Sequence, residues 1–200
     1  MLRLITLLCA LALPAKAQDV SGAFDYYVLS LSWSPNWCAL EGDSRNSPQC
    51  DADADFGWVL HGLWPQFETG WPANCRHTFR NPSRAETTAM ADIMGTSGLA
   101  WYQWNKHGSC SGLSPDDYFA LARLAFERIT RPEVFRRLED LRTLPASLVE
   151  EAFILGNPFL SPDEITLLLL ASRIHESRTC LPPALQPRSC GLAVIPPRSL

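Results

Sequence analysis

The spacing of hydrophobic and polar residues predicts two strands in the N-terminal part of the chain. Hydrophobic and polar residues alternate over residues 24–33, and β-branched and aromatic side chains are frequent there, which is typical of a strand. Residues 57–61 predict a second strand, which we expect to end at Gly62 and Pro65. The segment 41–55 between them is polar, rich in aspartate and contains Pro48, so it is predicted to be a loop.

Helix signals dominate the rest of the chain. Ser114 is a typical N-cap, followed by a proline and two acidic residues, and it predicts a helix that ends near Ile129. The same signature recurs from Ser161 to Glu164 and predicts the start of another helix, in which Glu164 would complete a capping box with Ser161. The leucines at 167–170 fit a helix or a buried strand equally well. Further helices are predicted at residues 83–94 (ending near Gly95 and Gly98), from Trp101 onwards, at 133–141 and at 147–155. Short strands mixed with helices, without strict alternation, favour an α+β fold.

The first 17 residues have the pattern of a signal peptide. Arg3 supplies the positive charge, residues 4–13 are apolar, and Ala15-Lys16-Ala17 is a small-x-small cleavage site. The apolar run is too short to span a bilayer, and a buried N-terminal helix would leave the cleavage site unexplained. We therefore expect an exported protein, periplasmic or secreted, with residues 18–200 as a single domain and no membrane attachment after cleavage.

The net charge restricts how the protein could bind a polyanion. The formal charge of the chain is −4, and loss of Arg3 and Lys16 with the leader moves it to −6. An acidic protein does not bind nucleic acid through a broad basic face. Contact would have to be local, with a few nucleotides at a cleft, which argues against a protein that coats RNA.

Cysteine usage predicts disulfides. Of the seven cysteines, Cys9 lies in the predicted leader, and six in an exported chain are typical of three disulfides, with 15 possible pairings. Zinc is disfavoured because the sequence has no C-x-x-C pair. The spacing suggests two short loops and leaves a third pair, which gives Cys38–Cys50, Cys180–Cys190 and Cys75–Cys110.

Two segments carry candidate chemistry. Between Trp101 and Cys110, the residues Gln103, Lys106 and His107 have the i, i+3, i+4 spacing of one helix face, and we expect the aromatic side of this helix to pack inward. Far upstream, the sequence Val-Leu-His-Gly-Leu-Trp-Pro delivers His61 from a predicted strand end. A lone histidine there is usually structural. Two imidazoles and a lysine at one point, however, suit a reaction that needs a base, an acid and a cation for a phosphate.

These segments resemble the two active-site signatures of the ribonuclease T2 family. The run from His61 to Pro65 matches the first signature, and Trp104, the Lys-His-Gly run at 106–108 and Cys110 fall in register with the second. The resemblance covers residues 32–190 and is weaker outside the two signatures. The C-terminal third is similar to that of bacterial members of the family. It implies an α+β fold in which an antiparallel sheet is flanked by helices and the two signatures face each other across a cleft. The family also pairs a cysteine after the first signature with the one that ends the second.

The resemblance implies a secreted endoribonuclease that needs no metal or cofactor. Single-stranded RNA would be cleaved by attack of its own 2′-hydroxyl, through a 2′,3′-cyclic phosphate to a 3′-phosphate, so DNA should not be a substrate. His107 is expected to be the general base, His61 the general acid, and Lys106 the cation beside the phosphate. Trp64 matches the base-binding tryptophan of the family. We expect a monomer.

Two positions depart from the second signature, which in the family reads His-Glu-Trp-x-Lys-His-Gly. Gln103 replaces a glutamate that helps to stabilise the phosphorane, and an amide can still donate a hydrogen bond. Tyr102 replaces the phosphate-binding histidine, and a phenol donates only a neutral hydrogen bond. A catalytically weakened or silent member that binds RNA or a partner protein is therefore an alternative, and an unrelated exported binding protein is a remoter one. His77 and His175 match no family position and are expected to lie at the surface.

Overall fold

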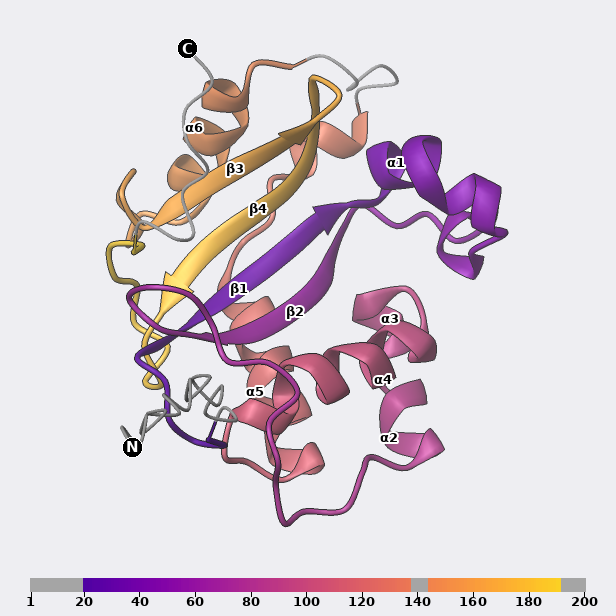
Figure 1. Ribbon diagram of the computed structural model, residues 1–200. Helices are drawn as coiled ribbons and strands as arrows, with labels where there is room; N and C mark the ends of the chain where they lie inside the picture. Colours follow the sequence, from indigo (N-terminus) through magenta and orange to yellow (C-terminus); the bar gives the residue numbers. More distant parts are fainter. Residues whose placement is uncertain (1–19, 138–143, 192–200) are drawn as a thin grey trace, which may run out of the picture.

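A computed structural model describes residues 20–137 and 144–191. Its centre is an antiparallel four-stranded sheet in the order β2-β1-β4-β3 (Figure 1), so the α+β expectation is confirmed. The strands are β1 (Tyr26–Trp33), β2 (Trp58–Gln66), β3 (Ile165–Leu170) and β4 (Arg173–Leu181). The predicted signal peptide lies outside the described residues.

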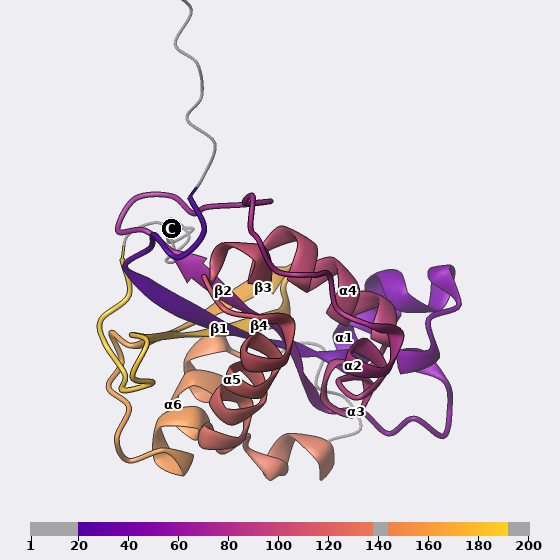
Figure 2. The ribbon, with the colours of Figure 1, turned by 90° about the horizontal axis from the view of Figure 1, so that it is seen from below.

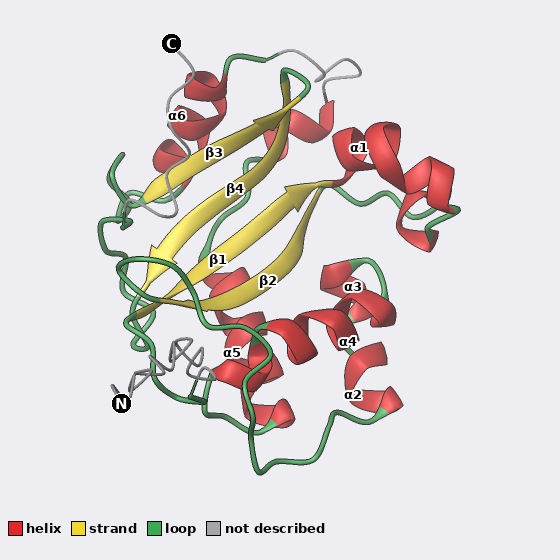
Figure 3. Cartoon of the chain, viewed as in Figure 1, coloured by secondary structure: helices red, strands yellow, loops and turns green. Residues whose placement is uncertain are grey.

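Helices flank the sheet, and a long connection crosses its other side. In Figure 2, α5 and α6 lie on one side of the sheet, whereas the segment that joins β2 to α2 passes on the opposite side. That segment, from residue 67 to residue 83, is mostly loop in Figure 3. The helices are α1 (Ser34–Trp37), α2 (Arg84–Thr88), α3 (Ala91–Met94), α4 (Ser97–Lys106), α5 (Pro115–Arg128) and α6 (Ala146–Gly156). None of the described helices has the length and apolar character needed to cross a membrane.

The central strand β1 is buried on both faces. Leu29 and Leu31 belong to the main hydrophobic core, which includes residues of α5 and α6. Val28 and Ser30 are buried on the opposite face, where Val28 packs with Tyr26 and, at its edge, with Trp64. The alternation of β1 therefore separates a purely structural face from a face that supports polar groups.

The predicted end of the second strand is wrong, because β2 continues through Gly62 and Pro65 to Gln66. Proline is tolerated here because β2 is an edge strand of the sheet. The register also slips within β2, since Ser30 faces Gly62 but Leu31 faces Leu60. His61 is thus the extra residue of a β-bulge, a feature that turns a side chain away from the regular alternation.

Cap signals predicted one helix correctly and misled at another position. In α5 the hydroxyl of Ser114 accepts from the backbone N–H of Asp117, as expected for an N-cap. The similar run from Ser161 to Glu164 does not begin a helix, although Glu164 accepts from the backbone N–H of Ser161 at 2.7 Å. The chain turns there and enters β3, because the leucines that follow pair with β4. The β4 strand itself was not predicted.

Several boundaries also differ from the prediction. Residues 83–94 form two short helices, α2 and α3, and α4 already begins at Ser97, where the hydroxyl of Thr96 caps it. The expected loop 41–55 contains short helical turns, and residues 133–137 form a 3₁₀ turn. Residues 138–141 lie outside the described part of the chain.

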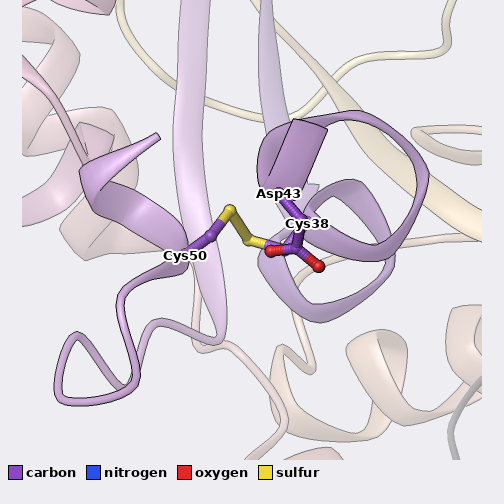
Figure 4. A group of neighbouring side chains, drawn as sticks. All are labelled: Cys38, Asp43 and Cys50. Atoms are coloured by element: carbon purple, nitrogen blue, oxygen red, sulfur yellow. A yellow bond between two sulfur atoms is a disulfide. The ribbon is translucent and has the colours of Figure 1, made fainter. Parts of the chain in front are cut away.

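The three predicted disulfides are all present. They are Cys38–Cys50, Cys75–Cys110 and Cys180–Cys190. The Cys75–Cys110 bond joins the segment after β2 to the turn that follows α4. Figure 4 shows the bonded sulfurs of Cys38 and Cys50 beside Asp43. Among the described residues, these three form the one group whose potential ligand atoms lie close enough together to hold a metal ion. Sulfurs already bonded to each other are not thiolate ligands, so this group is a crosslink and not a metal site.

Candidate active site

The predicted site residues lie in one cleft of about 410 Å³. Its floor includes Val28 and Glu176, on the face of the sheet that bears polar groups. The structure brings together all six residues singled out in the sequence: His61, Trp64, Tyr102, Gln103, Lys106 and His107. Strand β2 supplies the first two, and α4 with the residue that follows it supplies the other four.

A buried carboxylate holds His61. The Nδ1 atom of His61 lies 2.6 Å from Oε1 of Glu176, and the hydroxyl of Ser30 donates to the same oxygen. Arg178 donates from Nε to the other oxygen at 2.8 Å. Burial alone would raise the pKa of Glu176, but the bond to His61, the charges of His61 and Arg178 and the Ser30 bond lower it to about 2. Because Glu176 is therefore a carboxylate that can only accept, the Nδ1 atom of His61 carries a proton, and Nε2 is left for other partners.

His107 is buried against an indole ring. It lies just beyond α4, where its backbone N–H still donates to the carbonyl of Gln103 at 2.9 Å. Its imidazole stacks on Trp64 with ring centres 5.1 Å apart, and only 5% of the residue is exposed. Burial, followed by the charges of Lys106 and His61, lowers the pKa of His107 to about 3. The ring is consequently neutral at physiological pH, the state that a general base requires.

Trp64 touches both histidines and is fixed by an amide. Its indole N–H donates to Oε1 of Gln103 at 2.7 Å, and its ring meets His61 edge-on at 5.1 Å. A methyl group at Gly62 would lie 2.3 Å from the indole nitrogen and 2.5 Å from the Gln103 oxygen. Glycine is therefore needed at position 62 because the Trp64–Gln103 pair occupies the space beside its backbone.

Tyr102 and Lys106 lie at the opening of the cleft. Tyr102 is 53% exposed, and the Lys106 ammonium lies 5.7 Å from the centre of its ring. The tyrosine is thus placed where a bound anion could meet it. Trp101 is also 42% exposed, which contradicts the expectation that the aromatic side of this helix packs inward; only Trp104 is fully buried.

The prediction that both remaining histidines lie at the surface is wrong. His175 is half-buried and lines the cleft. It occupies a second bulge, since Leu168 faces Glu176 but Leu169 faces Ile174. His77 is half-buried outside the cleft, where its ring meets that of Trp104 edge-on at 5.3 Å.

Sequence reasoning missed further residues of the cleft, among them Trp71, Glu176 and Arg178. Glu176 and Arg178 lie two residues apart on β4, so they share one face of that strand. The signal was present but required the strand to be predicted first. Trp71 is exposed and lies in the segment between β2 and α2.

The comparisons with known proteins point to one family. The Ribonuclease T2 family model matches residues 24–146. A ribonuclease from Aeromonas hydrophila is 40% identical over 107 residues, which are 54% of this chain and 47% of that protein. Ribonuclease I from Escherichia coli is 29% identical over an alignment of 171 residues, and the match covers 66% of this chain and 62% of that protein. The chain spans about half the length of the curated relatives it matches.

Solved structures support the same fold. An RNase-related protein from Calystegia sepium superposes with a TM-score of 0.68 at 17% identity, covering 88% of this chain and 95% of that one. RNase NT in complex with 5′-AMP superposes with a TM-score of 0.53 at 19% identity, covering 84% and 96% of the two chains. At such identities these likenesses show the fold alone. The family model, in contrast, covers more than half of the chain, and the protein therefore belongs to the ribonuclease T2 family.

Proposed function

We propose that this protein is an exported endoribonuclease that cleaves single-stranded RNA without a metal or cofactor. The observation that carries the proposal is the presence of two imidazoles from distant segments, His61 and His107, in one cleft with the ammonium of Lys106. RNA brings its own nucleophile, the 2′-hydroxyl. A base, an acid and a cation are therefore the groups that the protein must add.

In the first step, neutral His107 accepts the proton of the 2′-hydroxyl as the O2′–P bond forms. His61, carrying protons on both nitrogens, donates the one on Nε2 to the 5′-oxygen as the P–O5′ bond breaks. Lys106 offsets the charge on the non-bridging oxygens, and the amide of Gln103 can donate to one of them. The product is a 2′,3′-cyclic phosphate, and water opens it to a 3′-phosphate with the two histidines in exchanged roles.

The low basicity of His107 depends in part on charges that a substrate would change. One of its causes is the charge of Lys106 at the neighbouring position. A bound phosphate would pair with this ammonium and so remove part of the repulsion that disfavours the imidazolium. Substrate binding should therefore raise the basicity of His107 at the moment when a base is needed.

The cleft also offers flat aromatic surface for a nucleobase. Trp64 remains the residue that we propose for base stacking, although one of its faces is occupied by His107. Trp71 lines the same cleft and is 55% exposed. Stacking on such rings is worth roughly 1–3 kcal/mol per base.

One set of observations favours the alternative of a silent family member that binds RNA or a partner protein. His107 is buried with a pKa of about 3, the indole of Trp64 contacts both histidines, and Tyr102 replaces a cationic phosphate ligand. Such a protein would bind RNA in this cleft without turnover. Retention of His61, Lys106 and His107 in one cleft supports the enzyme instead.

The deciding experiment is digestion of homopolymer RNAs and of DNA, with and without EDTA, followed by analysis of the product termini. We expect cyclic phosphate and then 3′-phosphate ends from RNA, unchanged cleavage in EDTA and intact DNA. His61→Ala and His107→Ala should each lower kcat by roughly 10²–10⁴, the range for loss of a general acid or base. His77→Ala, outside the cleft, should retain activity after correction for any change in melting temperature. Cleavage of DNA, or loss of RNA cleavage in EDTA, would refute the mechanism.

A further inference from the structure

Glu176 is a buried carboxylate to which the mechanism above gives no role. It is 2% exposed and lies in β4, whereas the histidine that it contacts lies in β2, two strands away. The two side chains meet above Ser30 of β1, because Ser30 faces both Gly62 and Arg178 in the strand register. A small residue at position 30 leaves the space in which the imidazole and the carboxylate reach each other.

Both oxygens of the Glu176 carboxylate accept hydrogen bonds. Oε1 accepts from His61 Nδ1 and from the hydroxyl of Ser30. Oε2 accepts from Nε and a terminal nitrogen of Arg178, at 2.8 and 2.7 Å. The Arg178 guanidinium in turn lies 5.2 Å from the Trp64 ring. A guanidinium offers donors only, so it fixes which oxygen is left to face the histidine.

We propose that Glu176 is a positioning residue for His61: it fixes the ring orientation and the Nδ1–H tautomer, and it supplies the counter-charge to the imidazolium that donates a proton from Nε2. Arg178 holds the carboxylate in the required orientation. This inference rests on the proposed function, because it assigns His61 its role as proton donor and acceptor. The acceptor on one ring nitrogen determines the state of the other, which is the general basis for such a role.

Glu176→Gln is a sharp test because it changes little except the direction of the hydrogen bonds. Arg178 can only donate, so the carbonyl oxygen of the new amide must face Arg178. Its NH₂ group then faces His61, whose Nδ1 must become an acceptor, and the neutral ring is forced into the Nε2–H tautomer. An imidazolium at this position would place donor against donor.

We therefore expect Glu176→Gln to lower kcat by roughly 10²–10⁴ with KM within about threefold, since the equivalent change in a known catalytic triad costs about 10⁴. The matched control is Asp92→Asn, which makes the same change in the Asp92–Arg123 ion pair outside the cleft and should leave kcat unchanged. If Glu176 acts only through His61, the double variant His61→Ala, Glu176→Gln should be no slower than His61→Ala alone.

A second readout does not depend on activity. The chain has four histidines, so ¹⁵N-labelled protein gives few ring signals, and the His61→Ala spectrum assigns the one of interest. In its neutral form His61 should carry its proton on Nδ1 in the wild type and on Nε2 in Glu176→Gln. If that variant does not fold, Glu176→Asp keeps the charge beside Arg178 but retracts the carboxylate from His61, and it should lower kcat by about 10-fold or more.

Two results would overturn the positioning role: Nδ1–H retained in Glu176→Gln, or kcat within about threefold of the wild type. Multiplicative losses in the double variant would also do so, because they would show a role of Glu176 separate from His61. Failure of the proposed function would instead be seen as no RNA cleavage by the wild-type protein. The NMR measurement decides the histidine–carboxylate arrangement in either case.

Discussion

The buried imidazole of His107 should make the folded protein sensitive to acid. The ring stacks on Trp64, and its Nδ1 atom has no hydrogen-bond partner among the described residues. Protonation would place a charge in this apolar contact beside Lys106. The informative change is His107→Phe, which keeps a flat ring against the indole, removes no hydrogen bond from Nδ1 and cannot titrate.

The sign and size of the effect follow from the pKa. The pKa of His107 falls from its usual 6.5 in the unfolded chain to about 3 in the folded protein, first through burial and then through the nearby cations. The unfolded chain therefore binds more protons between these values. The contribution of His107 to stability is fully present above about pH 6.5 and is lost as the pH falls towards 3. Evaluated between pH 7 and pH 4, the loss is about 3 kcal/mol.

The assay is urea unfolding of the wild type and of His107→Phe at several pH values from 7 to 4. Carboxylates that also lose stability in acid, such as Glu176, are shared by both proteins and largely cancel in the comparison. We expect the unfolding free energy of the wild type, relative to that of His107→Phe, to fall by about 3 kcal/mol between pH 7 and pH 4. A difference that stays constant with pH would show that the imidazole is solvated in the folded protein and would refute the burial argument. A shift of the opposite sign would show that the fold stabilises the imidazolium.

Three further changes test other parts of the cleft and its crosslink. Tyr102→His should raise kcat/KM on a dinucleotide by roughly 5- to 30-fold below about pH 7, because a charge-assisted hydrogen bond to the phosphate is stronger than a neutral one. Equal kcat/KM values for the two proteins from pH 4 to 8 would show that residue 102 does not contact the phosphate. Gly62→Ala should displace Trp64 and lower kcat by roughly 10²-fold with a folded core by circular dichroism, and wild-type turnover would contradict the packing argument. Replacing Cys75 and Cys110 by serine should cost roughly 4 kcal/mol of unfolding free energy for a loop of 35 residues, and an unchanged urea midpoint would contradict it.

Candidate site residues could be singled out from the sequence where the chemistry is local. His61 and His107 were found because motif residues cluster within a few positions of each. Their meeting in one cleft was expected only from the family resemblance, since it depends on how α4 packs beside β2. Glu176 was missed for the corresponding reason: its partners lie on other strands, and no nearby pattern marks it.

Cap signals predicted local hydrogen bonds better than the elements that follow them. At Ser161 the bond from its backbone N–H to Glu164 forms as in a capping box, but the next residues are recruited into the sheet by β4. A cap contributes about 1 kcal/mol, which is small beside the free energy of burying Ile165 and Leu167 in the core. Tertiary packing therefore decides the element, and the cap only shapes the turn before it.

The two bulges show how the missing strand could have been found. Leu60 and Leu63 both lie in the main core although they are three residues apart in a strand. Regular alternation would place them on opposite faces, so one extra residue must lie between them, and that residue is His61. In β4, Ile174 and Leu181 also lie in the core at an odd spacing, which requires a bulge that the structure places at His175. An apolar spacing of three or seven within an alternating run is therefore a signal for a bulged strand. Applied to residues 173–181, it predicts a bulged strand, and with the bulge at His175 the residues at 176 and 178 lie on the face opposite the core, where the cleft lies.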